Sequence, residues 1–244
     1  MTACFLCNSR SSCKLYSVRI QTQEDFITKK CIVGGTFLGL FVLWTGLVRT
    51  VDVQPIGPLG TSVGFATVNR FTHELTGVHM ALYALTDWLG LIPILIAAGF
   101  AFLGLGQWIR RKSLRKVDFS ILALGFFYIA TAAAFLFFEN HVINYRPLLI
   151  GGNLEASYPS STTLLAICVM PTAMHQFRTR IRHPLLRRWV VCLCAAFTGF
   201  MVIGRLISGV HWFTDIVGGI LLGAGLVTLY QGVASLSPAQ KTGL

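Results

Sequence analysis

Six long apolar stretches, separated by short polar segments, dominate the sequence. They cover residues 31–51, 88–108, 119–138, 162–177, 189–207 and 213–233. Each is close to the roughly 20 residues that a helix needs to cross the ~30 Å hydrocarbon core of a bilayer. The pattern therefore predicts an all-α integral membrane protein, a bundle of six transmembrane helices.

The composition supports a membrane location over a soluble one. Hydrophobic residues make up 54% of the 244-residue chain and charged residues only 12%, about half the charged share of soluble domains. The net charge of +11 does not indicate nucleic acid binding, because the basic residues lie in short clusters between apolar stretches. We expect the lipid bilayer as partner and no nucleic acid.

The basic residues also predict the orientation of the chain. With six spans, sixteen of the twenty fall on one side: those in segments 1–30, 110–116 and 178–188, and Lys241. The other four are Arg49, Arg70, Arg146 and Arg205. Basic loops stay on the cytoplasmic side of a membrane. We therefore expect both termini in the cytoplasm and a multi-pass protein of the plasma membrane.

The two ends of the chain are polar and lie outside the predicted bundle of residues 31–236. Residues 1–30 are expected to form a disordered cytoplasmic tail, and residues 237–244 a second tail. Three cysteines in the first tail are spaced as Cys-x2-Cys-x5-Cys, at Cys4, Cys7 and Cys13. The spacing resembles part of a zinc site, but no fourth ligand is evident, so reduced thiols are the simpler interpretation and no metal is expected.

Between the first two spans, apolar residues recur at steps of three and four, at Val68, Phe71, Leu75, Val78 and Leu82. This is the period of one helical face. It predicts a helix lying flat at the membrane interface, either a guide for a lipid or a packed connector.

Arg205, His211 and Asp215 form the most informative polar group. Arg205 closes the fifth predicted span, His211 follows in a short turn, and Asp215 lies at i+4 from the histidine. An arginine within a span is costly and indicates function. A carboxylate on one ring nitrogen would leave the other nitrogen free to attack, while Arg205 suits a pair of phosphate oxygens. The alternative is that His211 and Asp215 only cap a helix.

Two further segments fall on the same predicted side. Pro159, Ser160 and Ser161 stand where a loop turns into the fourth span, so the N–H groups of that helix would face an anion. Arg146 lies in the preceding loop, where it either pairs with Glu139 or Glu155 or joins Arg205 in a phosphate clamp.

The motifs Asn144-Tyr-Arg-Pro147, Tyr158-Pro-Ser-Ser-Thr162 and Gly204-Arg-x5-His-x3-Asp215 resemble the signature of the PAP2 superfamily of membrane lipid phosphatases. That signature reads Lys-x6-Arg-Pro, Pro-Ser-Gly-His and Ser-Arg-x5-His-x3-Asp on a six-helix bundle. The resemblance implies phosphate binding by Arg146, Arg205, Ser160 and Ser161. It also implies that His211 is the nucleophile of a phosphohistidine route oriented by Asp215, without metal or other cofactor.

The chain departs from this signature at several positions. Glu139 replaces the family lysine, Ser161 the glycine, Thr162 the second histidine, and Gly204 a serine. The second histidine protonates the leaving oxygen, which threonine cannot do at neutral pH. A diphosphate substrate, which leaves as a phosphate monoester, would need this acid less, and His141 or a protonated Glu139 would be substitutes.

The sequence thus predicts a metal-independent hydrolase of lipid phosphates or diphosphates, such as isoprenoid diphosphates or phosphatidic acid, with its active site facing outward. One alternative is a catalytically impaired relative that binds or transports a phosphorylated lipid. A solute transporter fits less well, because no inverted repeat or pair of broken helices is visible.

Overall fold

The computed structural model describes the backbone of residues 10–236 and the side chains of residues 21–236. Within this part of the chain all regular elements are helical. The α-helices are α1 (Arg10–Thr50), α2 (Ala66–Thr76), α3 (Met80–Leu89), α4 (Leu91–Arg111), α5 (Phe119–Asn140), α6 (Ser161–Arg180), α7 (Pro184–Ile207) and α8 (Phe213–Ala234). Two single 3-10 turns, η2 (Pro58–Gly60) and η3 (Leu114–Lys116), lie in the connections.

Five helical segments of the described chain are long and apolar enough to cross a membrane. They are residues 21–50, 80–111, 119–140, 184–207 and 213–234. The second joins α3 and α4, because Gly90 between them keeps a helical backbone with φ −58° and ψ −19°. The prediction of an all-α, multi-pass membrane protein is therefore confirmed for these five spans.

The sixth predicted span, residues 162–177, forms helix α6 but is not one of the five. Polar side chains on α6, including Thr163, Thr172 and Gln176, are fully buried. Thr172 Oγ1 lies 3.1 Å from Tyr128 Oη of α5, and Gln176 Nε2 donates to Tyr230 Oη of α8 at 2.6 Å. Because α6 packs against α4, α5, α7 and α8, it contacts protein on most sides and does not need an apolar surface.

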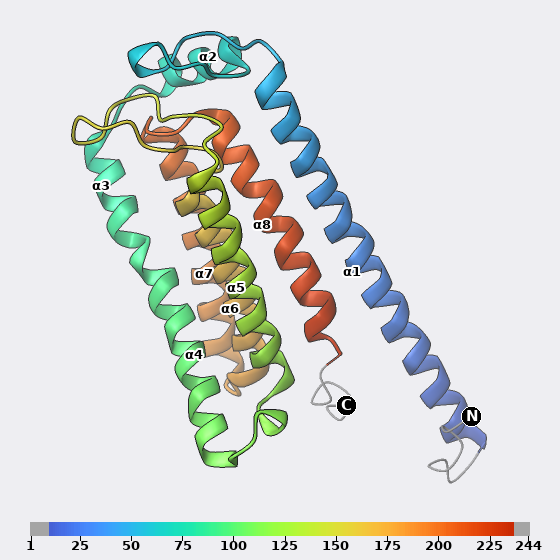
Figure 1. Ribbon diagram of the computed structural model, residues 1–244. Helices are drawn as coiled ribbons and strands as arrows, with labels where there is room; N and C mark the ends of the chain where they lie inside the picture. The colour runs from blue at the N-terminus through green and yellow to red at the C-terminus, as the bar shows by residue number, and fades with distance from the viewer. Residues whose placement is uncertain (1–9, 237–244) are drawn as a thin grey trace.

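The helices run roughly side by side, and the connections gather at two ends (Figure 1). One end carries α2, the 141–160 loop and the turn between α7 and α8; we call it the α2 end. The opposite end carries η3 and the α6–α7 connection, and we call it the η3 end. Helix α1 packs along α8, and the first turn of α1 and the last turn of α8 both point toward the η3 end (Figure 1).

The first helix begins earlier than the sequence pattern suggests. Residues 10–30, predicted as a disordered tail, continue α1 as helix, because Gln, Glu, Lys and Arg have good helix propensity and extend an existing helix at low cost. The predictions for residues 1–9, which include Cys4 and Cys7, and for residues 237–244 lie outside the described residues.

The predicted interfacial helix is present but shorter. Helix α2 ends at Thr76, and Gly77, with φ +68°, turns the chain into α3. On α2 the large apolar side chains of Val68, Phe71 and Leu75 are exposed, as expected for a helix that lies at a membrane surface.

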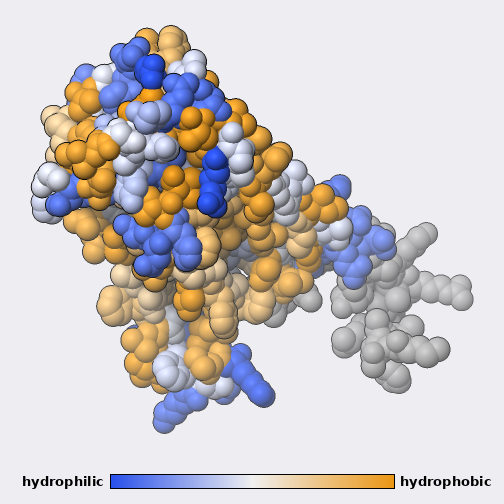
Figure 2. Space-filling model, turned by 45° about the horizontal axis from the view of Figure 1, so that its top comes forward, coloured by the Kyte–Doolittle hydropathy of each residue, from blue (hydrophilic) through white to orange (hydrophobic). Residues whose placement is uncertain are grey.

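Polar and basic residues collect at the two ends of the molecule. Arg110, Arg111 and Lys112 close α4 beside η3, and Arg178 and Arg180 close α6 at the same end. Figure 2, which brings the α2 end forward, shows hydrophilic side chains over that end and a largely hydrophobic flank beside it. This is the distribution expected of a bundle that crosses a bilayer.

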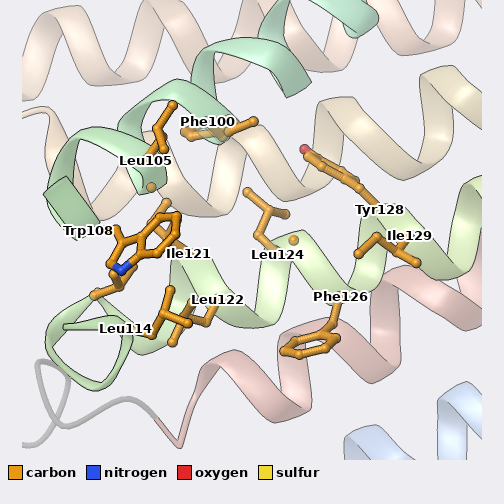
Figure 3. A pocket seen from close by; sticks show the side chains of 14 residues that line it. Phe100, Leu105, Trp108, Leu114, Ile121, Leu122, Leu124, Phe126, Tyr128 and Ile129 are labelled. Carbon is orange, nitrogen blue, oxygen red and sulfur yellow. The ribbon is translucent and has the colours of Figure 1, made fainter. Parts of the chain in front are cut away.

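An apolar hollow of about 350 Å³ lies between α4 and α5 beside η3 (Figure 3). Phe100, Leu105 and Trp108 line it from α4, and Ile121 and Leu124 from α5. Among the described residues, no charged side chain lines this hollow. The charged residues predicted to bind phosphate lie at the α2 end instead.

Candidate active site

The three segments singled out from the sequence converge at the α2 end. Segment 144–147 belongs to the loop after α5, segment 158–162 enters α6, and segment 204–215 closes α7 and opens α8. Main-chain hydrogen bonds join them, from Ser157 N to Asn144 O at 2.9 Å and from Ser160 N to Asp215 O at 3.0 Å. Residues far apart in the sequence are thus held in one polar cluster.

The turn that carries His211 is fixed by close backbone packing. Gly209 has φ +70°, and a Cβ there would lie 2.0 Å from Gly77 O. His79 N donates to Ser208 O at 3.0 Å in the same contact. Only glycine fits a left-handed position with a carbonyl so near, so the α2–α3 junction and the histidine turn form one packed unit.

His211 is 3% exposed and reaches Asp215 through a third residue. Its Nδ1 is 3.8 Å from Asp215 Oδ2, too far for a direct hydrogen bond. Ser157 lies between them: its hydroxyl donates to Asp215 Oδ2 at 2.5 Å, and its Oγ is 3.0 Å from His211 Nδ1. Asn144 Nδ2 and Trp212 N also donate to the carboxylate, at 3.2 and 2.9 Å.

The hydrogen bonds of Ser157 indicate which nitrogen of the His211 imidazole carries the proton. A hydroxyl has one proton, and that of Ser157 is used toward Asp215. The Ser157 oxygen therefore accepts from the His211 Nδ1–H, so the Nε2 of the neutral ring carries a free lone pair. His211 lies in the turn between α7 and α8, where burial, helped by the charges of Arg146 and Arg205 and opposed by Asp215, lowers its pKa to about 4. At neutral pH the ring is a potential nucleophile.

Arg205 lies in the last turn of α7, and its side chain is 1% exposed. Its Nη1 donates to Thr86 Oγ1 at 3.3 Å, and its Nη2 is 3.6 Å from Asp87 Oδ1. Its guanidinium carbon stands 5.0 Å from the ring centroid of Tyr83. All three partners are on α3, so α3 positions this arginine.

Arg146 approaches the same aromatic ring from the loop, with its guanidinium carbon 5.8 Å from the Tyr83 centroid. Its Nε lies 3.0 Å from Glu155 Oε2, but the angle is not that of a hydrogen bond. The two arginines thus share Tyr83, and each has one carboxylate nearby. The two arginines predicted to bind phosphate are brought together.

Buried polar atoms without partners concentrate at this place. Seven such side-chain atoms occur in the described residues, and five belong to Arg146, Ser160, Arg205 and His211. Buried polar groups are normally hydrogen-bonded, so a cluster of exceptions indicates a ligand site. Ser160 also precedes the first turn of α6, where the helix N–H groups favour an anion. Two guanidinium groups, a helix N-terminus and a free imidazole lone pair together suit a phosphate group.

The remaining predicted site residues lie at the edge of the polar cluster and are less buried. Ser161 and Thr162 occupy the first turn of α6 and are half-buried. Glu139 is exposed at the end of α5 and lines a small hollow with Ser161. His141 is exposed, its ring stacks on Phe137 at 4.4 Å, and its Nδ1 is 2.9 Å from the Phe137 carbonyl. The structure does not bring His141 together with His211.

Sequence reasoning missed Ser157, Tyr83 and Asp87. Glu155, one of the two carboxylates expected as partners of Arg146, does lie 3.0 Å from its Nε. Ser157 stands directly before a motif that was recognised, and its neighbour Tyr158 is buried as well. Asp87 is an ionisable residue near the start of an apolar stretch, which is itself a signal of function. Tyr83 carries no comparable signal, because its role depends on contacts with the distant residues Arg146 and Arg205. In the part of the chain that the structure describes, no group of three His, Cys, Asp or Glu side chains could hold a metal ion.

Comparison with known proteins shows the family and the fold of the chain. The sequence profile of the PAP2 superfamily matches residues 94–235, more than half of the chain. A search of curated proteins finds no match. Among solved structures, the fold is similar to the crystal structure of a transmembrane PAP2-type phosphatidylglycerolphosphate phosphatase from Bacillus subtilis, with a TM-score of 0.55 and 17% identity over 82% of this chain and 94% of that one. The chain belongs to the PAP2 superfamily.

Proposed function

We propose that this protein is a membrane lipid phosphatase that removes a terminal phosphate from a lipid phosphate or diphosphate through a phosphohistidine at His211. The observation that carries the proposal is the buried, unpartnered Nε2 of His211 next to unpartnered donors of Arg146, Arg205 and Ser160. Among the described residues none hydrogen-bonds to these atoms, and a phosphate group supplies the acceptors that the donors lack.

In the first half of the reaction, His211 Nε2 attacks the phosphorus atom. The bond from phosphorus to the leaving oxygen breaks, and its electron pair goes to that oxygen. Arg146 and Arg205 stabilise the charge on the transferred phosphoryl group, and the Nδ1–H bond to Ser157 stabilises the developing imidazolium through Asp215. A phosphohistidine and the free leaving group result.

In the second half, water attacks the phosphohistidine and the phosphorus–nitrogen bond breaks. Phosphate is released and the electron pair returns to Nε2. The chain has Thr162 where the family has its second histidine, so a diphosphate, whose leaving group depends less on an acid, is the substrate class that fits best.

The proposed orientation places the site at the outer face of the membrane, with α6 completing six spans and both termini in the cytoplasm. The basic residues that close α4 and α6 lie at the η3 end, and basic loops favour the cytoplasmic side. The α2 end, with His211, then faces outward, toward the outer leaflet of the plasma membrane. The exposed apolar side chains of α2 would rest on that leaflet.

A second candidate function is supported by Thr162 alone. A relative without a proton-transfer group at this position would bind or move a phosphorylated lipid without hydrolysing it.

Phosphate release tests the proposal. Purified protein in dodecyl maltoside, with EDTA present, is assayed with farnesyl diphosphate and with phosphatidic acid, beside the His211→Ala variant. We expect release by the wild type, faster from the diphosphate, and none by the variant. Binding of both lipids by folded protein without any release would favour the second candidate.

A further inference from the structure

The hollow next to Thr162 contains one charged side chain. This hollow, of about 470 Å³, lies between α3–α4, α5 and α6, and Ser161 and Thr162 line it from the start of α6. Apolar residues such as Ile94 and Phe135 make up most of its wall, and Asp87 is the only charged residue that lines it. Among the described residues, Asp87 is therefore the one carboxylate of this hollow that could accept a proton next to Thr162.

Asp87 links this hollow to the proposed phosphate site. Its Oδ1 is 3.6 Å from Arg205 Nη2, and its side chain is 59% exposed while that of Arg205 is 1% exposed. Three residues further along, Gly90 lies against α6, since a Cβ there would be 3.8 Å from Thr162 Cγ2. The carboxylate thus stands between the buried arginine and the Thr162 position, with more than half of its own side chain exposed.

We propose that Asp87 is a catalytic residue that accepts the proton of the water hydrolysing the phosphohistidine, a proton transfer that Thr162 cannot perform. This inference rests on the proposed function. The water oxygen bonds to phosphorus, the phosphorus–Nε2 bond breaks with its electron pair returning to His211, and the water proton passes to the Asp87 carboxylate. The exposed side chain then releases that proton to solvent.

A purely structural role for Asp87 predicts something different. If the carboxylate only positions Arg205, its removal changes phosphate affinity and phosphohistidine formation. If it is the base, formation stays nearly unchanged with a diphosphate, and the decay of the phosphohistidine slows. Measuring the formation and the decay of the phosphohistidine separately therefore distinguishes a positioning role of Asp87 from that of a base.

The experiment uses rapid mixing of the full-length protein with farnesyl diphosphate labelled in its terminal phosphate. In Asp87→Asn, label should appear on the protein at a rate within about threefold of wild type and decay about 10²- to 10⁴-fold more slowly, the range expected for loss of a general base. The double variant Asp87→Asn/Thr162→His, which returns an imidazole to the position the family uses, should recover most of the decay rate. The hollow beside Thr162 has room for that ring.

Glu155→Gln is the matched control, because it removes the carboxylate beside the other arginine, Arg146, and Glu155 does not line the hollow. It should alter the KM and slow the decay of the phosphohistidine far less than Asp87→Asn does.

Decay in Asp87→Asn at the wild-type rate would overturn the role of Asp87 and leave the proposed function intact. So would a slow decay that Thr162→His does not restore, or an equal slowing in Glu155→Gln. Failure of the proposed function would look different, since wild type would then neither release phosphate nor form a labelled protein.

Discussion

The chemistry at the residue scale centres on Ser157, which connects His211 to Asp215. The hydroxyl donates to the carboxylate and its oxygen faces Nδ1, so Ser157 transmits the influence of Asp215 across a gap of 3.8 Å. That hydroxyl is the direct hydrogen-bond acceptor of Nδ1–H, and it favours the tautomer with a free Nε2.

Ser157→Ala should therefore lower kcat by about 10- to 100-fold, the loss typical of partners that orient a functional imidazole, with a smaller change in KM. Steady-state release of phosphate from farnesyl diphosphate measures both. Ser235→Ala, which removes a similarly buried hydroxyl near the η3 end, serves as control. Equal losses in the two variants would show that Ser157 contributes only to packing.

The lowered pKa of His211 predicts the pH dependence. The neutral ring attacks and the imidazolium cannot, so kcat/KM for the diphosphate should be lost as the pH falls through about 4, well below the ordinary histidine value of 6.5. The free energy of unfolding should also decrease as the pH falls from 6.5 to about 4, because the unfolded chain binds this proton more tightly. A titration of kcat/KM with a midpoint near 6.5 would contradict the buried environment of His211.

Much of this site could be predicted from the sequence, for identifiable reasons. His211 and Asp215 stand at positions i and i+4, a spacing that places them on one face of a helix. Arg205 is a cation within an apolar span, and the free-energy cost of a charge there indicates a functional role. Ser157 contacts His211, which lies 54 residues later in the chain. Tyr83 and Asp87 contact Arg205, which lies 122 and 118 residues after them. No local sequence pattern encodes contacts over such separations.

At the scale of elements, the contact between α3 and α7 decides where Arg205 lies. Gly204 packs against α3, and a Cβ there would be 2.9 Å from Thr86 Cγ2. The serine of the family signature at this position would meet the same atom, which explains the glycine of this chain. The sequence predicted α7 well, but not that Gly77 ends α2 and lets α3 join the bundle, because this turn depends on the backbone contact with Gly209.

Gly204→Ala should destabilise the protein by about 1–3 kcal/mol, the usual cost of overpacking, and weaken binding of inorganic phosphate through the displaced Arg205. Thermal unfolding in detergent and phosphate titration measure the two effects. Gly199→Ala on the same helix is the control, since nothing lies within 4 Å of a Cβ at Gly199. Indistinguishable results for both variants would argue against the α3–α7 contact.

Helix α6 illustrates the limit of hydropathy as a guide to elements. Its boundaries, Ser161–Arg180, include the predicted stretch 162–177. Thr172 and Gln176 are buried and hydrogen-bond inside the bundle, so the composition of α6 reflects protein neighbours more than lipid.

At the scale of the whole molecule, the account requires that the α2 end and the η3 end lie on opposite sides of the membrane. Asn153 is exposed in the 141–160 loop and Arg115 is exposed in η3. Single cysteines at these positions, in a background without the seven native cysteines, report their location.

A membrane-impermeant maleimide should label Asn153→Cys in intact cells and Arg115→Cys only after permeabilisation. Labelling of both in intact cells, or the reverse order, would refute the proposed orientation with its outward-facing site.

The central claim is that His211 carries the phosphoryl group during turnover. Protein mixed rapidly with terminally labelled farnesyl diphosphate, quenched in alkali and digested, should yield an acid-labile, alkali-stable phosphate on the peptide that contains His211. His211→Ala, purified as a folded protein, should show neither label nor release of phosphate. Release at the wild-type rate by His211→Ala, or label on a different residue, would contradict the account.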